Sequence, residues 1–367
     1  MKQHIRRISK WLFIFLLIYA IVLIGGFFGV RYGLTNTAGI VDQESNVFQE
    51  NNREAELLEI LEQSENNKNK ISDEMKGKIY CKINAIADFA PANAEQIRKT
   101  YENTKSDVLV SKMIFAVTLR LSQSDVFNRK MEMCDGLGKD GVKFPANIPG
   151  DQNIFPWMNN DEWHAIAEAT IKDKSAIVRA GEMTGIEPRL IVSCMIVEQL
   201  RLFNSQRELF KKFFQPLKIL GNANKISLGV MGIKETTATQ IESHLVEINS
   251  PYYLGKNYEH SLDSISGSTF DRLTSEKENH YNSYLYGALY LKQMMNQWQK
   301  AGYDIQYRPE IVGTLFNVGF PQSRPKAEPK VGGSAITIGE AKYSFGSLAY
   351  EFYYSGEMQS EFPYIVK

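Results

Sequence analysis

The sequence predicts a mainly all-α protein. Apolar residues recur at spacings of three and four along several segments, and the clearest is residues 280–300, which place seven apolar or aromatic side chains on one face. A second observation is residues 190–197, which are apolar except for Ser193 and follow Pro188, a residue suited to the first turn of a helix. One short strand pair is expected around residues 335–338.

Length and charge limit the classes of protein to which this chain can belong. The chain has 367 residues, of which 43% are hydrophobic, and its formal net charge is +0. This length accommodates one large domain and a smaller one. Because there is no basic excess, nucleic acid is not expected as a partner.

An uncharged segment, residues 11–30, follows a basic start at residues 1–10. It is long enough to span a bilayer as a helix, and the positive flank places residues 1–10 in the cytoplasm and the bulk of the chain outside. A cleaved signal peptide is the competing interpretation. We favour an uncleaved anchor, because the apolar run exceeds a usual signal-peptide core and no small-residue cleavage site follows it cleanly. The expected location is the cell (inner) membrane, crossed once, with a periplasmic or extracytoplasmic body.

Composition and periodicity divide the rest of the chain. Residues 31–46 have the composition of a polar linker, and residues 47–145 are predicted to form a small helical stalk domain without recognisable chemistry. Residues 136–141 match a phosphate-binding glycine pattern but lack the strand and helix that this pattern requires. The second domain, with a C-terminal extension, is expected over residues 151–367.

Three helical segments are expected in the stalk. The leucines of residues 57–61 form one apolar stripe, residues 79–89 form a second that Pro91 ends, and residues 108–126 form a third. In the second domain, Gly185 is expected to end the first helix, and a basic and aromatic stretch at residues 204–225 is expected to cover the core. The helices predicted there span residues 161–184, 188–198, 280–300, 309–319 and 345–354.

Cysteine and histidine usage indicates no metal. Cys81, Cys134 and Cys194 fit no metal-ligand spacing, and the five histidines include no metal-binding pair or cluster, so neither a metal nor another cofactor is expected. Outside the cytoplasm Cys81 and Cys134 can form a disulfide, which leaves Cys194 as a small apolar residue of a buried helix. Three unpaired buried cysteines are an equally weighted alternative.

Glu198 is the candidate for chemistry. It emerges near the C-terminal end of the apolar helix, where desolvation and the negative end of the helix dipole both disfavour its anion. A carboxyl group held in its neutral form suits a general acid. For a lone glutamate, a capped or surface role is the ordinary alternative.

Two later segments strengthen this interpretation. After the helix that ends in Glu198 come Ser227-Leu-Gly-Val-Met-Gly-Ile-Lys-Glu-Thr-Thr-Ala238 and then Gly313-Thr-Leu-Phe-Asn-Val-Gly319. In this order, over about residues 177–320, the chain resembles the lytic transglycosylases of the soluble, goose-type-lysozyme-like class. The resemblance implies a lysozyme-like helical domain with Glu198 as catalytic acid. It also implies contacts with the sugar from two sets of residues, Gly229, Val230 and Met231 in a loop and Phe316 and Asn317 in the third segment.

By this resemblance the chain cleaves the MurNAc–GlcNAc bond of peptidoglycan and leaves 1,6-anhydro-MurNAc ends. One glutamate then suffices as acid and base. Hydrolysis, the reaction of a lysozyme, is an alternative that the sequence leaves open, and it usually needs a second carboxylate. Glu187, Glu235 and Glu310 lie at predicted helix starts, where capping or dipole roles are expected. Tyr284 is the best candidate for stacking on a sugar, although most tyrosines of its helix are expected in the core.

The chain departs from the family at three of these positions. Gln199 stands where the family has Ser, Gly232 where it has Gln, and Phe316 where it has Tyr. These departures motivate a rival function, a scaffold that binds glycan strands without cutting them in an envelope-spanning assembly, with residues 47–145 facing a protein partner. An open groove beside Glu198 would favour the enzyme, and an ion-paired Glu198 would favour the scaffold.

Overall fold

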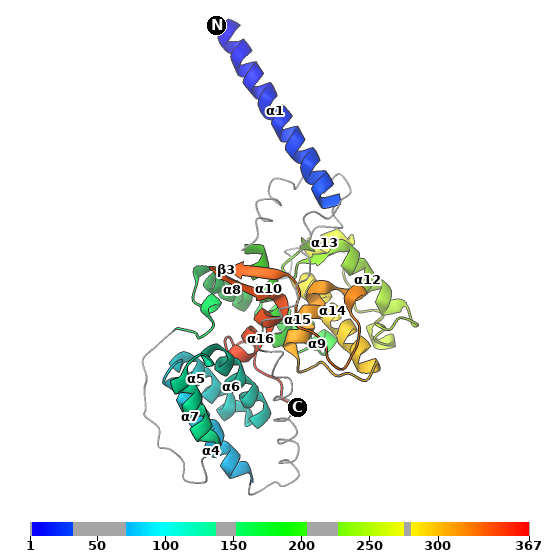
Figure 1. The fold of residues 1–367 in the computed structure, drawn as a ribbon. Coiled ribbons are helices and arrows are strands. Elements are labelled where there is room, and N and C mark those ends of the chain that lie inside the picture. Colours follow the sequence, from blue (N-terminus) through cyan, green and yellow to red (C-terminus); the bar gives the residue numbers. More distant parts are fainter. Residues whose placement is uncertain (1, 32–70, 137–151, 204–226, 275–279, 367) are drawn as a thin grey trace.

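The computed structural model describes residues 2–31, 71–136, 152–203, 227–274 and 280–366, and it is mainly helical (Figure 1). The all-α class is therefore confirmed. Several predictions lie outside the described residues. They are the linker at 32–46, the leucine stripe at 57–61, most of the glycine pattern at 136–141 and the basic aromatic stretch at 204–225.

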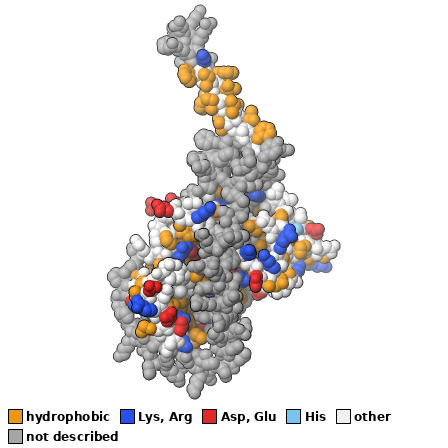
Figure 2. Space-filling model, viewed as in Figure 1, with side chains coloured by type: hydrophobic (Ala, Val, Ile, Leu, Met, Phe, Trp, Pro, Cys, Tyr) orange, Lys and Arg blue, Asp and Glu red, His pale blue; other side chains and the backbone are white. Residues whose placement is uncertain are grey.

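The N-terminal segment forms one helix, α1 (Lys2–Arg31), whose large apolar side chains between Trp11 and Phe28 are mostly exposed (Figure 2). Within the described residues, no helix combines the length and the apolar character needed to cross a membrane. A membrane span at residues 11–30 stays a prediction.

Four helices make up the described part of the predicted stalk: α4 (Ile71–Ala87), α5 (Pro91–Thr104), α6 (Asp107–Leu121) and α7 (Asp125–Asp135). The single helix predicted over residues 108–126 is wrong. α6 ends at Leu121, and the side chain of Ser124 accepts a hydrogen bond from the amide of Phe127 and so caps a new helix. Apolar periodicity continues across this break, which is why the pattern does not reveal it.

A disulfide joins α4 to α7. It links Cys81 to Cys134, which are 53 residues apart, and Cys194 stays unpaired and buried in the second domain. The structure therefore contains the disulfide rather than three unpaired cysteines.

Replacing both Cys81 and Cys134 by Ser is expected to lower the free energy of unfolding by about 2–4 kcal/mol, because the cross-link no longer restricts the unfolded chain. Urea unfolding of the full chain, followed by circular dichroism, measures the change. Reducing agent should bring the native protein to the level of the variant and leave the variant unaltered. Equal stability of the oxidised and reduced native protein would contradict the prediction.

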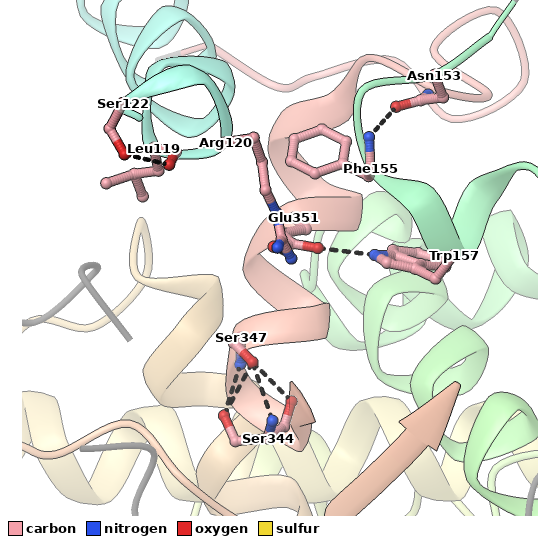
Figure 3. Close-up of polar contacts among 9 residues, drawn as sticks. All are labelled: Leu119, Arg120, Ser122, Asn153, Phe155, Trp157, Ser344, Ser347 and Glu351. Carbon is pink, nitrogen blue, oxygen red and sulfur yellow. Dashed lines mark hydrogen bonds and ion pairs between the residues drawn. The ribbon is translucent and has the colours of Figure 1, made fainter. Parts of the chain in front are cut away.

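The predicted stalk packs against the rest of the protein through α16 (Phe345–Ser355), the last helix. Arg120 of α6 forms an ion pair with Glu351 of α16, and the indole nitrogen of Trp157 donates to the other oxygen of Glu351 at 2.7 Å (Figure 3). Side chains of both regions belong to one hydrophobic core. α16 therefore holds the stalk helices and the second domain together.

The second domain is built around α10 (Pro188–Phe203), which contacts α8, α9, α14, α15 and α16. Between Leu190 and Val197 every residue of α10 is buried, as the apolar run predicts. The neighbouring helices are α8 (Asp161–Lys172), α9 (Lys174–Thr184), α12 (Glu235–Val246), α13 (Thr269–Thr274), α14 (Tyr281–Lys300) and α15 (Pro309–Val318). Short 3-10 helices lie at Pro156–Met158, Lys256–Tyr258 and Phe320–Gln322.

The helix predicted over residues 161–184 is also wrong, because α8 and α9 are separated at Asp173. The backbone leaves the helical conformation there, with φ −89° and ψ 7°. The Oδ2 atom of Asp173 accepts a hydrogen bond from the hydroxyl of Tyr284 at 2.8 Å and lies 2.7 Å from Nδ1 of His280. Contacts with distant residues thus accompany a break that local periodicity does not show.

Two antiparallel strand pairs complete the described fold. β3 (Ala335–Ile338) pairs with β4 (Ala341–Ser344), which confirms the predicted strand pair, and Ser344 then caps α16 together with Ser347 (Figure 3). β1 (Ser227–Leu228) pairs with β2 (Ile233–Lys234), so that residues 229–232 form a tight turn before α12.

Candidate active site

Glu198 lies in the last turns of α10 and is only 3% exposed. Its neighbours Ile196, Val197 and Leu200 are fully buried. The side chain of Glu198 is therefore buried at the end of the apolar run, as the sequence predicts. Such an environment disfavours an uncompensated charge.

The charge of Glu198 is compensated by Arg201, one turn further along the helix. Nε of Arg201 donates to Oε2 of Glu198 at 2.8 Å, and Nη2 donates to Oε1, so that the contact is bidentate. The side chain of Glu198 is 4% exposed and that of Arg201 is 10% exposed. No other described residue forms a hydrogen bond with this carboxylate.

The same pair fixes the charge of Arg201. Burial on its own lowers the pKa of Arg201, but the negative charge of Glu198 and its hydrogen bond outweigh burial, and the pKa is raised. The guanidinium therefore stays positive whatever the protonation state of its surroundings at neutral pH.

The turn between β1 and β2 covers Glu198. Gly232 has a left-handed backbone conformation, with φ +61°, and a Cβ atom built on it would lie 2.0 Å from Oε1 of Glu198. Nε2 of Gln199 donates to the backbone oxygen of Val230 at 2.5 Å. Gln199 thus holds the turn, and Gly232 leaves room for the carboxylate beneath it.

The turn is also anchored on its far side, at α13 and α14. Met231 is fully buried, its amide donates to the hydroxyl of Ser283 at 3.1 Å, and its side chain lies against Gly287. Gly229 is exposed and Val230 is half-buried. Of the three loop residues predicted to border the sugar, Met231 therefore lies in the core and the other two lie nearer the surface.

Phe316 and Asn317 of α15 face the C-terminal segment. The ring of Phe316 lies 5.5 Å from that of Tyr290 and 6.1 Å from that of Phe345. Oδ1 of Asn317 accepts hydrogen bonds from the amide and the hydroxyl of Ser334, at 2.7 and 3.0 Å. Among the described residues, no hydrogen bond joins either side chain to Glu198.

Tyr284 is buried on α14, and its hydroxyl donates to Asp173. Burial, together with the charge and the hydrogen bond of Asp173, raises the pKa of Tyr284 well above its ordinary value. The structure gives this side chain a core position, and its role in sugar stacking stays a prediction.

The other candidate acids have different surroundings. Glu187 accepts hydrogen bonds from the hydroxyl of Tyr353 at 2.6 Å and from the amide of Ile365 at 3.1 Å. Burial raises the pKa of Glu187, although these hydrogen bonds act against it. Glu310 is paired with Arg308 at 2.9 Å, and Glu235 lies in the first turn of α12. Glu187 thus joins the start of α10 to the C-terminal segment, and the contact of Glu310 is local to the start of α15.

Sequence reasoning missed the roles of Arg201 and Gln199. The spacing Glu-x-x-Arg was a usable signal for the first, since residues three apart are neighbours on a helix surface. The contact of Gln199 with Val230 joins residues 31 apart, and no local pattern indicates it. Among the described residues, no group of three or more His, Cys, Asp or Glu is arranged to hold a metal ion.

Gly232→Ala tests the close approach of the turn to Glu198. We expect it to lower the free energy of unfolding by about 2–3 kcal/mol, because a left-handed Ala costs about 1–2 kcal/mol and the new methyl group also displaces the carboxylate. Urea unfolding measures the change.

Gly339→Ala is the matched control, because Gly339 has φ +60° and no atom within 4 Å of the added Cβ. It should show the backbone cost alone. Repeating Gly232→Ala in a Glu198→Ala protein should bring its effect down to that of Gly339→Ala. An equal effect of Gly232→Ala in both backgrounds would mean that the turn does not press on Glu198.

Comparisons of the chain with protein-family models, with curated proteins and with solved structures found no match. The resemblance to lytic transglycosylases therefore rests on the three sequence segments alone. Function follows from these residues only as a proposal.

Proposed function

We propose that this protein is a membrane-anchored lytic transglycosylase that cleaves the MurNAc–GlcNAc bond of peptidoglycan with Glu198 as its acid and base. The observation that carries the proposal is the position of Glu198, a carboxyl group in the apolar end of α10 directly beneath the turn 229–232. These are the two segments that the resemblance assigns to the catalytic acid and to the edge of the sugar site.

The proposed reaction needs one carboxyl group. Neutral Glu198 donates its proton to the glycosidic oxygen as the bond between that oxygen and C1 of MurNAc breaks. The 6-hydroxyl of the same MurNAc then attacks C1, and the carboxylate of Glu198 takes the hydroxyl proton. The products are a 1,6-anhydro-MurNAc end and a GlcNAc with a free 4-hydroxyl, and Glu198 is protonated again.

An extracytoplasmic location supports this substrate. The uncharged residues 11–30 lie in α1, a continuous helix with exposed apolar side chains (Figure 2). The disulfide between Cys81 and Cys134 is of the kind that persists in oxidising compartments outside the cytoplasm. We therefore propose that α1 anchors the protein in the cell membrane and that residues 47–145 face a protein partner of the envelope.

The ion pair of Glu198 favours a second candidate function. A carboxylate bound by Arg201 is an anion and cannot donate a proton in that state. The turn also leaves no space for a side chain at position 232. Both observations suit a scaffold that binds glycan strands without cutting them.

Mass spectrometry of purified sacculi incubated with the full chain in mild detergent separates the candidates. Release of 1,6-anhydromuropeptides is the expected result. Reducing-end products would instead indicate a hydrolytic lysozyme with a second acid. Binding to sacculi without any release would establish the scaffold, and neither binding nor release would overturn both candidates.

A further inference from the structure

The pairing of Glu198 with Arg201 imposes a charge condition on the proposed reaction. With Glu198 ionised, the two buried side chains have no net charge. A proton donor must be neutral, and once Glu198 is neutral the buried guanidinium of Arg201 has lost its counter-charge. An unpaired buried charge is strongly disfavoured, so a catalytic state requires a replacement anion beside Arg201.

The described residues do not supply this anion, since Glu198 is the only described carboxylate that pairs with Arg201. A ligand that enters the site can supply it. A guanidinium binds a carboxylate through two parallel hydrogen bonds, which is the geometry that Arg201 already makes with Glu198.

We propose that Arg201 determines substrate specificity by exchanging Glu198 for a carboxylate of the glycan strand, so that the protein selects carboxylate-bearing glycans over neutral ones. This inference rests on the proposed function, and it assigns to Arg201 a role that the three sequence segments do not include.

The arrangement of the pair suits such an exchange. Arg201 is the more exposed partner, with 10% of its side chain accessible against 4% for Glu198, so an incoming anion meets the guanidinium first. The covering turn has an exposed residue, Gly229, and is held to α10 by the hydrogen bond of Gln199 to Val230. When the strand carboxylate takes over Arg201, Glu198 is free to accept a proton from solvent.

The test measures binding rather than cleavage. Fluorescence anisotropy at low temperature would compare two end-labelled probes for the full chain in mild detergent. The first probe is glycan strands whose stem peptides have free carboxylates, and the second is the same strands with these carboxylates converted to methylamides. The native protein is expected to bind the carboxylate strands about 10-fold more tightly or better.

Substitutions at the two positions of the pair should act in opposite directions. Arg201→Gln is expected to abolish the preference for carboxylate strands, whereas Arg201→Lys, which keeps the charge, should retain part of it. Glu198→Gln removes the internal competitor, so we expect several-fold tighter binding of carboxylate strands and unchanged binding of the methylamide strands. A purely structural role of the pair would weaken both kinds of binding.

Arg98 and Glu95 provide a matched control. They form an exposed ion pair with the same spacing of three residues. Arg98→Gln and Glu95→Gln therefore change the net charge by the same amounts as the substitutions at Arg201 and Glu198, but at an exposed position. Both variants should behave like the native protein. Thermal unfolding of each variant verifies that it is folded.

Each other outcome overturns the inference. Equal affinity of the native protein for the two kinds of strand would refute selection by Arg201 and leave the proposed transglycosylase standing. A gain in Glu95→Gln as large as that in Glu198→Gln would show a general charge effect. Failure of every variant to bind either kind of strand would overturn the proposed function as well.

Discussion

Glu198→Gln is expected to lower the rate at which 1,6-anhydromuropeptides are released from sacculi by about 10³-fold, the effect of removing a positioned general acid. The amide keeps the size of the side chain but has no proton acidic enough to donate to a glycosidic oxygen. Its oxygen still accepts a hydrogen bond from Arg201, and thermal unfolding verifies that the variant is folded. The measurement is the initial rate of product release, quantified by mass spectrometry at equal protein concentration.

Glu187→Gln is the control, because Glu187 is a half-buried glutamate at the other end of the same helix, and its partners are Tyr353 and Ile365. This variant should lower stability and leave the products and their rate of release nearly unchanged below its unfolding temperature. If Glu198→Gln cleaved at the native rate, the acid would have to be another residue, and the proposed mechanism would be wrong.

The sequence predicts the main helices of the protein well because their apolar residues recur at regular spacings. Helix α14 follows from one apolar stripe, and α10 follows from an apolar run after Pro188. Where the prediction fails, at Asp173 and at Ser124, the apolar spacing continues across the break. At Asp173 the difference is made by His280 and Tyr284, more than 100 residues away, and local patterns do not contain that information.

The candidate site could be predicted from the sequence only in part. Glu198 is visible in the sequence because a carboxylate at the end of an apolar helix is unusual. The state of that carboxylate is not visible, since the spacing to Arg201 allows a contact without requiring one. The contact of Gly232 with Glu198 depends on how the turn folds back over α10, and only the structure explains why Gly stands where the family has Gln.

Arg189→Met is expected to have the largest effect on stability, a loss of about 3–5 kcal/mol in the free energy of unfolding. Arg189 is fully buried at the start of α10. It donates to four backbone oxygens, those of Tyr353 at 2.9 Å, Glu357 at 2.8 Å, Phe352 at 3.1 Å and Phe362 at 3.4 Å. Methionine fills much of the same volume but donates to none of them. The oxygens of Glu357 and Phe362 would then lose their donor from Arg189, whereas those of Phe352 and Tyr353 would keep only the hydroxyls of Ser355 and Tyr364.

Urea unfolding of the full chain measures this loss, and hydrogen exchange of residues 352–366 locates it. Arg189→Lys should fall between the native protein and Arg189→Met, because a lysine keeps the charge but cannot reach four separated oxygens at once. Arg98→Met, at an exposed arginine, should leave the unfolding midpoint unchanged. A loss below about 1 kcal/mol for Arg189→Met would mean that packing, rather than these hydrogen bonds, attaches the C-terminal segment to α10. Because α16 also carries Glu351, the partner of Arg120, the same loss should loosen the stalk helices from the second domain.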